Sequence, residues 1–369
     1  MVYCVITPRL SPLADGLGDF CRRLWDNWPD KDQKWQFLVL EGAAGSKEIW
    51  TEVEIDNFNA DTIETQLASL APDLVILHYV GYAYSPDGCP TWLNTALSTY
   101  KASGGRLAVM FHETWSSGLP WQSAFWHQKK QKQCIGNLLD LADLVVTTTR
   151  ANLYSLLDIR PKATIKIIHL GNSFGELPTL AKKWQQLLIF GKEPSRQRAI
   201  HRHEQLLHSL CSKGLIKRIV LAGSKNDIDS NREKKMLEHI CKNADHDVEI
   251  ITCYNFDEQH IPTSILQSGL SLMHTQSTHL LKSTSFQLAA NLGQVAICIR
   301  ELPADLPFEP LVHYIDYTPK RMDFVHSAVS HPAALQVISE NLYDAGKEQL
   351  SWSRIARDWH NSINTILGN

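Results

Sequence analysis

The N-terminal stretch "VYCVITPRLSPLADGLGDFCRRLWDNW", residues 2–28, decides the fold. Its apolar run from Val2 to Thr7 predicts a strand, and the residues after "DGLGDF" predict a helix. Gly16 and Gly18 lie where the strand passes to the helix. We weigh two explanations for them: a tight turn that needs positive φ angles, or a ligand that must touch the backbone.

The same alternation of strand and helix continues through the first half of the chain. Helix-like segments at 62–70 and 91–104 separate runs rich in apolar residues. Continuous apolar runs are typical of strands buried on both faces, and their alternation with helices predicts a parallel sheet. The strand-like runs lie at 3–7, 36–41, 74–80, 106–113 and 144–149.

A second series follows a break in this rhythm between Pro161 and Pro178. Its strand-like runs lie at 187–192, 218–223, 248–254, 269–275 and 294–299. Near the C-terminus, apolar residues recur at helical spacing and predict an amphipathic helix: Trp352, Ile355, Ala356, Trp359, Ile363 and Ile366. We predict two doubly wound α/β domains, 1–175 and 176–345, followed by a helical segment at 346–369.

Composition excludes several classes of protein. A formal net charge of -3 argues against a nucleic-acid binder, and we interpret the basic runs "HQKKQK" at 127–132 and "NREKKM" at 231–236 as solvated surface. The eight cysteines are scattered without a C-x-x-C motif, as in a reduced cytoplasmic protein. The sequence shows no secretory signal and no apolar run near the ~18 residues of a membrane span.

Ligands of doubly wound sheets lie beyond the carboxyl ends of the strands. In the first domain, "FHETW" places His112 and Glu113 at such an end, and we predict them as catalytic residues. A satisfied core histidine is the alternative for His112. The residues predicted to face the acceptor or sugar are Asp15, Gly16, Gly18, Asp19, Tyr79 and Tyr82.

The second domain has residues suited to a diphosphate. "FGKEPSRQR" supplies Lys192, Arg196 and Arg198, and guanidinium and ammonium groups suit phosphates. "KSTS" supplies Lys282, Ser283, Thr284 and Ser285 at the predicted start of a helix, which favours anions. A solvated loop and an ordinary helix cap are the alternatives. We assign Gly191, Tyr254 and Asn255 to the nucleoside.

Taken together, these motifs resemble those of glycosyltransferases of the GT-B fold, close to family 4 (glycosyl transferases group 1). "DGLGDF" is similar to the family's glycine loop, and "FHE" resembles its sugar-contacting histidine. Further similar segments are "ADLVVTTTRANLYSLL", "LLIFGK", "LAANLGQVAICI" and "WSRIARDW". The chain departs from the family where "THLLKSTSFQLAANLG" lacks the usual pair of glutamates, with Gln287 near the second position.

The resemblance implies a GT-B fold, with two Rossmann-like domains facing a central cleft and the last helix packing back across the first. It implies retaining transfer of a sugar from a UDP- or GDP-sugar to an acceptor hydroxyl, in polysaccharide or glycolipid synthesis. We expect no cofactor and no metal site, since basic residues would stabilise the diphosphate. The resemblance also implies a carbohydrate or lipid-linked acceptor, and a cytoplasmic protein for which peripheral contact with the inner face of the membrane is one expectation.

Two other functions stay open. A GT-B-type nucleotide-sugar epimerase would need carboxylates in the cleft, which Glu113 and Asp19 would supply. A non-catalytic nucleotide-sugar-binding subunit would explain the missing glutamates. Donor hydrolysis without an acceptor distinguishes the transferase, and free epimerisation of the donor distinguishes the epimerase.

Overall fold

The chain forms two compact units in a computed structural model. Unit 1 comprises Met1–Gly171 with Trp352–Asn369, and unit 2 comprises Asn172–Ser351. The structure describes residues 1–10, 16–39, 50–54, 59–119, 121, 123–175, 177–225, 231–242, 247–256, 260–301 and 307–368. Asp15, predicted to face the acceptor, lies outside the described residues.

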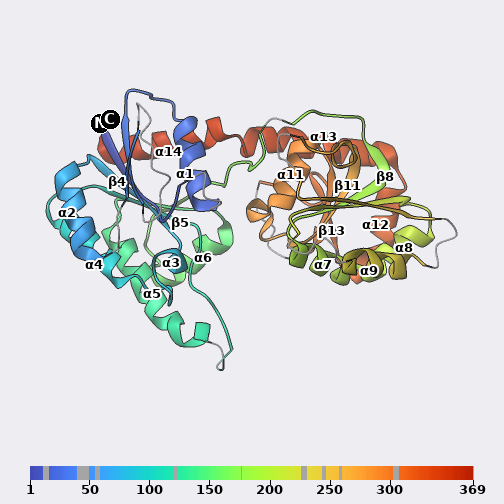
Figure 1. Ribbon diagram of the computed structural model, residues 1–369, viewed down its shortest axis with the longest axis horizontal. Coiled ribbons are helices and arrows are strands. Elements are labelled where there is room, and N and C mark those ends of the chain that lie inside the picture. Colours follow the sequence, from blue (N-terminus) through green and yellow to red (C-terminus); the bar gives the residue numbers. More distant parts are fainter. Residues whose placement is uncertain are drawn as a thin grey trace. The chain divides into compact units, whose positions relative to one another are not determined.

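Unit 1 is built on a seven-stranded parallel sheet with the order β3-β2-β1-β4-β5-β6-β7 (Figure 1). Along β1, Cys4 and Ile6 belong to the core on one face, and Tyr3 and Val5 belong to the core on the other. This burial on both faces confirms the interpretation of the first apolar run. The strands are β1 (Val2–Ile6), β2 (Lys34–Val39), β3 (Trp50–Glu54), β4 (Leu74–Tyr79), β5 (Leu107–Phe111), β6 (Leu144–Thr147) and β7 (Ile165–Ile167).

The helices of unit 1 pack on both faces of its sheet. The last of them comes from the C-terminal segment, and it buries Ile355, Ala356, Trp359 and Ile363 in the same core as α1. The predicted apolar stripe is therefore confirmed as a buried face. The helices are α1 (Gly16–Asp26), α2 (Ala60–Leu70), α3 (Gly81–Tyr84), α4 (Thr91–Ala102), α5 (Ser123–Leu141), α6 (Arg150–Ile159) and α14 (Trp352–Leu367).

Unit 2 repeats the plan with a six-stranded parallel sheet in the order β10-β9-β8-β11-β12-β13 (Figure 1). Its strands are β8 (Lys183–Phe190), β9 (Arg218–Gly223), β10 (Glu249–Tyr254), β11 (Ser268–Gln276), β12 (Val295–Ile299) and β13 (Tyr314–Tyr317). Its helices are α7 (Glu193–Arg202), α8 (Glu204–Ser212), α9 (Arg232–Cys241), α10 (Thr263–Leu266), α11 (Thr284–Leu292), α12 (Met322–Val329) and α13 (Pro332–Gln349), with short 3-10 turns η1 (Leu280–Lys282) and η2 (Pro319–Arg321).

Each sheet reverses its strand order once. The reversal lies between β1 and β4 in unit 1, and between β8 and β11 in unit 2. The crevice at the carboxyl ends of two such strands is where doubly wound sheets bind ligands. No helix in the described parts of the chain is long and apolar enough to cross a bilayer.

Candidate functional site

The carboxyl ends of β8 and β11 bring a glycine loop and a hydroxyl-rich helix start together. Gly191 follows β8 with a φ of +138°, and Lys192 is the N-cap residue of α7. Ser285, in the first turn of α11, donates its hydroxyl to the carbonyl of Phe190 at 2.7 Å. Two segments that the sequence places at different strand ends of one sheet are therefore joined by a hydrogen bond.

The start of α11 has the form of an anion site. Ser283 caps the helix, and its Oγ accepts from the backbone N–H of Phe286 at 3.3 Å and from the hydroxyl of Thr275 at 3.0 Å. Thr284 is exposed, and Lys282 is half-buried at the end of η1. Because the first N–H groups of a helix carry partial positive charge, this end favours a negatively charged ligand.

Further positive charge lies along α7. The side chains of Lys192 and Arg198 are exposed, and Arg198 Nη2 lies 3.4 Å from Ser195 Oγ. Burial lowers the pKa of His274 on β11, and the positive charges of Arg198 and Arg202 lower it further. The face of α7 that meets β11 is therefore electropositive near the strand ends.

Arg196 does not serve the diphosphate as predicted, which is a correction. Its guanidinium is fully buried, and Nε and Nη2 each donate to the carboxylate of Glu233 at 2.8 Å. Nη1 donates to the carbonyls of Gly191, Ala222 and Ser224. Because these N–H groups donate to acceptors of the protein itself, Arg196 connects the loop that follows β8 with the loop that follows β9. Glu233 belongs to the run 231–236, which the sequence analysis interpreted as solvated surface; for Glu233 that interpretation is wrong, because its carboxylate is fully buried against Arg196, 37 residues away along the chain.

Two of the predicted nucleoside residues, Tyr254 and Asn255, contact a buried lysine, Lys225. The side-chain amide of Asn255 accepts from the backbone N–H of Lys225 and donates to its carbonyl, both at 2.9 Å. The ammonium of Lys225 lies 4.4 Å from the ring centroid of Tyr254, and Arg196 lies 4.8 Å from it on the same ring. Burial and the charge of Glu233 raise the pKa of Tyr254. Lys225 was missed, although it follows the strand run 218–223 closely.

In unit 1, His112 meets a second histidine. Its Nε2 lies 3.0 Å from Nδ1 of His78, so one ring donates and the other accepts. The ring of Phe20 from α1 packs edge-on against both imidazoles, with centroids 5.3 and 5.2 Å away. Burial lowers the pKa of His78 to about 3. The side chain of His112 is 9% exposed, and its Nε2 atom is paired with His78. Both observations agree with the alternative that His112 is a hydrogen-bonded core histidine.

The other predicted residues at these strand ends separate into core and surface. Tyr79 is 1% exposed and packs its ring against Phe111 at 5.4 Å. Its assignment to the acceptor side is wrong, because both faces of β4 are covered and the side chain of Tyr79 belongs to the core on one of them. Glu113 and Tyr82 are exposed, and the hydroxyl of Tyr82 lies 2.9 Å from Ser116 Oγ.

The two N-terminal glycines have different surroundings. Neither has a positive φ, which excludes the turn explanation for both. A Cβ on Gly18 would lie 2.4 Å from the carbonyl oxygen of Arg9, whereas one on Gly16 would meet no atom of the described residues within 4 Å. Gly18 therefore allows close packing of the chain on itself, and Gly16 is the first residue of α1. Asp19 forms an ion pair with Arg23 at 2.8 Å.

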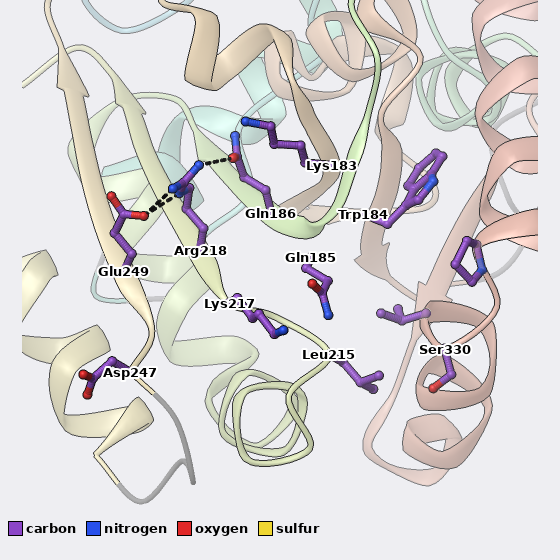
Figure 2. A pocket seen from close by; sticks show the side chains of 12 residues that line it. Lys183, Trp184, Gln185, Gln186, Leu215, Lys217, Arg218, Asp247, Glu249 and Ser330 are labelled. Carbon is purple, nitrogen blue, oxygen red and sulfur yellow. Dashed lines mark hydrogen bonds and ion pairs between the residues drawn. The ribbon is translucent and has the colours of Figure 1, made fainter.

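A hollow of about 660 Å³ lies at the opposite edge of the unit 2 sheet (Figure 2). It is formed around the amino ends of β8, β9 and β10, where Lys183, Arg218 and Glu249 begin the strands. Figure 2 shows Arg218 joined to Glu249 and Gln186. Because this edge is remote from the strand ends that bind ligands in such folds, we do not assign the hollow to the candidate site. Within the described residues, no group of three His, Cys, Asp or Glu side chains is placed to hold a metal.

Comparison with known proteins gives a fold but no family. No family model and no curated protein matches the sequence. Among solved structures, Anabaena HepE in complex with UDP-glucose matches 99% of this chain and 100% of its own, with a TM-score of 0.63 at 11% identity. A UDP-forming α,α-trehalose-phosphate synthase from Burkholderia xenovorans matches with a TM-score of 0.60 at 10% identity, covering 99% of both chains.

A third match is WaaG, a glycosyltransferase involved in lipopolysaccharide biosynthesis, with a TM-score of 0.55 at 10% identity over 100% of both chains. All three cover this chain nearly end to end. The chain therefore has the GT-B fold of these glycosyltransferases, and the predicted fold class is confirmed. At this level of identity the likeness concerns the fold alone.

Proposed function

We propose that this protein is a retaining, metal-independent hexosyltransferase that transfers a sugar from a nucleoside-diphosphate donor to an acceptor hydroxyl. The observation that carries the proposal is the hydrogen bond by which Ser285 joins the start of α11 to the loop at Gly191, at the ends of β8 and β11. We infer that a diphosphate binds there. As the glycosidic bond breaks, the diphosphate gains negative charge. Lys192, Lys282 and the N–H groups of α11 would stabilise that charge without a metal.

UDP is the nucleotide we favour over GDP. HepE was solved with UDP-glucose, and the trehalose-phosphate synthase is described as UDP-forming. We place the reaction in the cytoplasm, in polysaccharide or glycolipid synthesis, with a carbohydrate or lipid-linked acceptor. No further cofactor is part of the proposal. The roles of His112 and Glu113 in the transfer stay predictions.

The test begins with nucleotide binding. Calorimetry should show UDP binding more tightly than GDP. Lys282→Ala should weaken UDP binding by about 1–3 kcal/mol, because a phosphate would lose a charged hydrogen-bonding partner. Lys217→Ala is the matched control, since Lys217 is exposed at the amino edge of the same sheet. Equal affinity of the Lys282→Ala variant and the parent protein would remove Lys282 from the site.

Turnover is measured separately as release of UDP from UDP-sugars, with and without acceptors. Slow donor hydrolysis without an acceptor is expected of a transferase. A specific observation favours a second candidate, a non-catalytic nucleotide-sugar-binding subunit. Residues 277–293 contain no carboxylate to hold the ribose hydroxyls, and Gln287 Oε1 is occupied by the N–H and hydroxyl of Ser173 at 3.2 and 2.9 Å. Tight UDP-sugar binding without any turnover would favour that subunit over the transferase.

A further inference from the structure

Large apolar side chains are exposed together at the start of α5. Trp121 is 77% exposed, Trp126 69%, Leu119 52% and Phe125 40%. These are four of the eleven exposed large apolar side chains among the described residues, and they fall within eight positions of sequence. Monomeric proteins rarely gather apolar surface in this way unless the surface binds something.

The next turn of the same helix is basic. Lys129 and Lys130 are exposed, four residues after Phe125 and Trp126, so each lysine lies above an aromatic residue on the outward face. The opposite face of α5 is buried in unit 1 through Cys134, Ile135 and Leu138. Residues 123–139 contain no aspartate or glutamate. We call Leu119, Trp121, Phe125, Trp126, Lys129 and Lys130 the α5 patch.

The chemistry of the α5 patch selects its partner. Tryptophan and phenylalanine settle at the level of lipid headgroups, where an apolar ring is buried and a polar edge stays wet. Lysines one turn away would face the phosphates of anionic lipids, which attract basic residues near the bilayer surface. An acidic protein partner would explain the lysines but not the two exposed tryptophans, Trp121 and Trp126.

We propose that the α5 patch docks this protein onto the surface of an anionic lipid bilayer. Trp121, Phe125 and Trp126 enter the headgroup region, and Lys129 and Lys130 contact lipid phosphates. The inference is independent of the proposed transferase activity, because lipid binding requires neither donor nor turnover. Lys129 and Lys130, part of the run at 127–132 that the sequence alone presents as solvated surface, become the basic half of a lipid-binding surface.

Co-sedimentation of the full-length protein with vesicles is the test. Vesicles of phosphatidylcholine with about one-third phosphatidylglycerol should bind the protein, and vesicles of phosphatidylcholine alone should bind it more weakly. High salt should weaken binding to the anionic vesicles, because it screens the lysines. The Trp121→Ser/Trp126→Ser variant should lose at least about tenfold in its partition coefficient. Lys129→Glu/Lys130→Glu should lose a similar factor at low salt and less at high salt.

Matched controls come from exposed residues elsewhere on the chain. Tyr154→Ser/Phe324→Ser removes two exposed aromatic side chains, and Lys162→Glu/Lys320→Glu reverses two exposed charges. Both controls should bind vesicles like the parent protein. Lipids brominated near the headgroup should quench part of the tryptophan fluorescence. Trp121→Phe/Trp126→Phe should lose that quenching while still sedimenting.

Three results would overturn the proposal. One is a parent protein that binds neither type of vesicle, and another is a Trp121→Ser/Trp126→Ser variant with an unchanged melting curve that binds as well as its parent. The third is self-association in sedimentation equilibrium that this variant abolishes, because the α5 patch would then join two copies of the chain. All the substituted side chains are exposed, and the lysine variant tests the surface even if the tryptophan variant folds poorly.

Discussion

Lys192 and Arg196 follow the same strand in one short motif, yet they have opposite environments. Lys192 is exposed at the start of α7, whereas Arg196 is fully buried against Glu233 from α9. The difference arises from helix geometry, because the side chain one turn into α7 faces the sheet. A charge so far from water requires a partner, and the structure supplies it in a bidentate ion pair. A basic motif alone does not indicate which of its cations will be available to a ligand.

Gly18 offers a test of packing at the residue scale. In Gly18→Ala the new Cβ would lie 2.4 Å from the Arg9 carbonyl oxygen and 2.9 Å from Leu10 Cα, both backbone atoms. We expect a loss of about 1–3 kcal/mol in the free energy of unfolding, because the backbone must shift to admit the methyl group. Gly16→Ala is the matched control and should cause no loss, since its Cβ meets no atom within 4 Å in the part of the chain that the structure describes. Denaturant titration of the two variants compares them, and equal destabilisation would contradict this account of Gly18.

His78 predicts a pH dependence of stability. Burial lowers its pKa to about 3, compared with about 6.5 in an unfolded chain. Below pH 6.5 the unfolded chain therefore binds a proton that the folded protein does not, and unfolding becomes easier. From pH 7 to pH 5 this one group should lower the free energy of unfolding by about 2 kcal/mol.

The groups around His78 define the control for that measurement. Its ring is surrounded by His112, Phe20 and Trp359, with no carboxylate among these ring contacts to favour the charged form. His78→Asn should show a smaller loss of stability between pH 7 and pH 5 than the parent protein in denaturant titrations. An equal slope in both proteins would mean that other groups cause the acid sensitivity.

At the scale of elements, apolar runs predict the central strands better than the edge strands. The runs at 3–7, 74–80 and 106–113 correspond to β1, β4 and β5 in the middle of the sheet. The sequence analysis missed β3 and β13, which form edges of their sheets. In β13 the run "YIDY" contains Asp316, which is buried because Arg300 and Arg321 pair with it. A short strand with a charged centre is not distinguished from a loop by its pattern.

The last helix gives a prediction at this scale. Trp359 of α14 is fully buried in unit 1, with its ring 6.0 Å from that of His78. Trp359→Ala should lower the free energy of unfolding by about 3–5 kcal/mol, because it leaves a large cavity. Arg357→Ala, an exposed position on the same helix, should change it by no more than about 0.5 kcal/mol. Thermal and denaturant unfolding measure both, and a mild effect at Trp359 would show that α14 contributes little to the core.

At the scale of the whole molecule, one plan is used twice. Each unit orders its strands so that the first strand of the unit lies at the reversal, β1 in one sheet and β8 in the other. The match to HepE persists at 11% identity because this plan depends on where apolar residues recur rather than on which apolar residues they are. Any activity must then be argued from the strand ends, where the individual residues matter.

The sequence by itself determined the alternation of buried strands with helices, the two-sheet plan and the buried stripe of α14. It also placed Lys192 just after β8 and Ser285 in the first turn of α11, two segments that the structure joins through the Ser285 hydroxyl. Anion binding there stays a prediction. These features can be predicted from short stretches of sequence, because hydrophobic periodicity and helix starts depend on residues that are close together along the chain. Only the tertiary structure decided that Arg196 forms an ion pair with Glu233. It also decided that His112 is hydrogen-bonded to His78 and that the backbone at Gly18 packs against the backbone of Arg9. Those contacts join residues from different elements, and they depend on strand register and helix packing, which no short stretch of sequence contains.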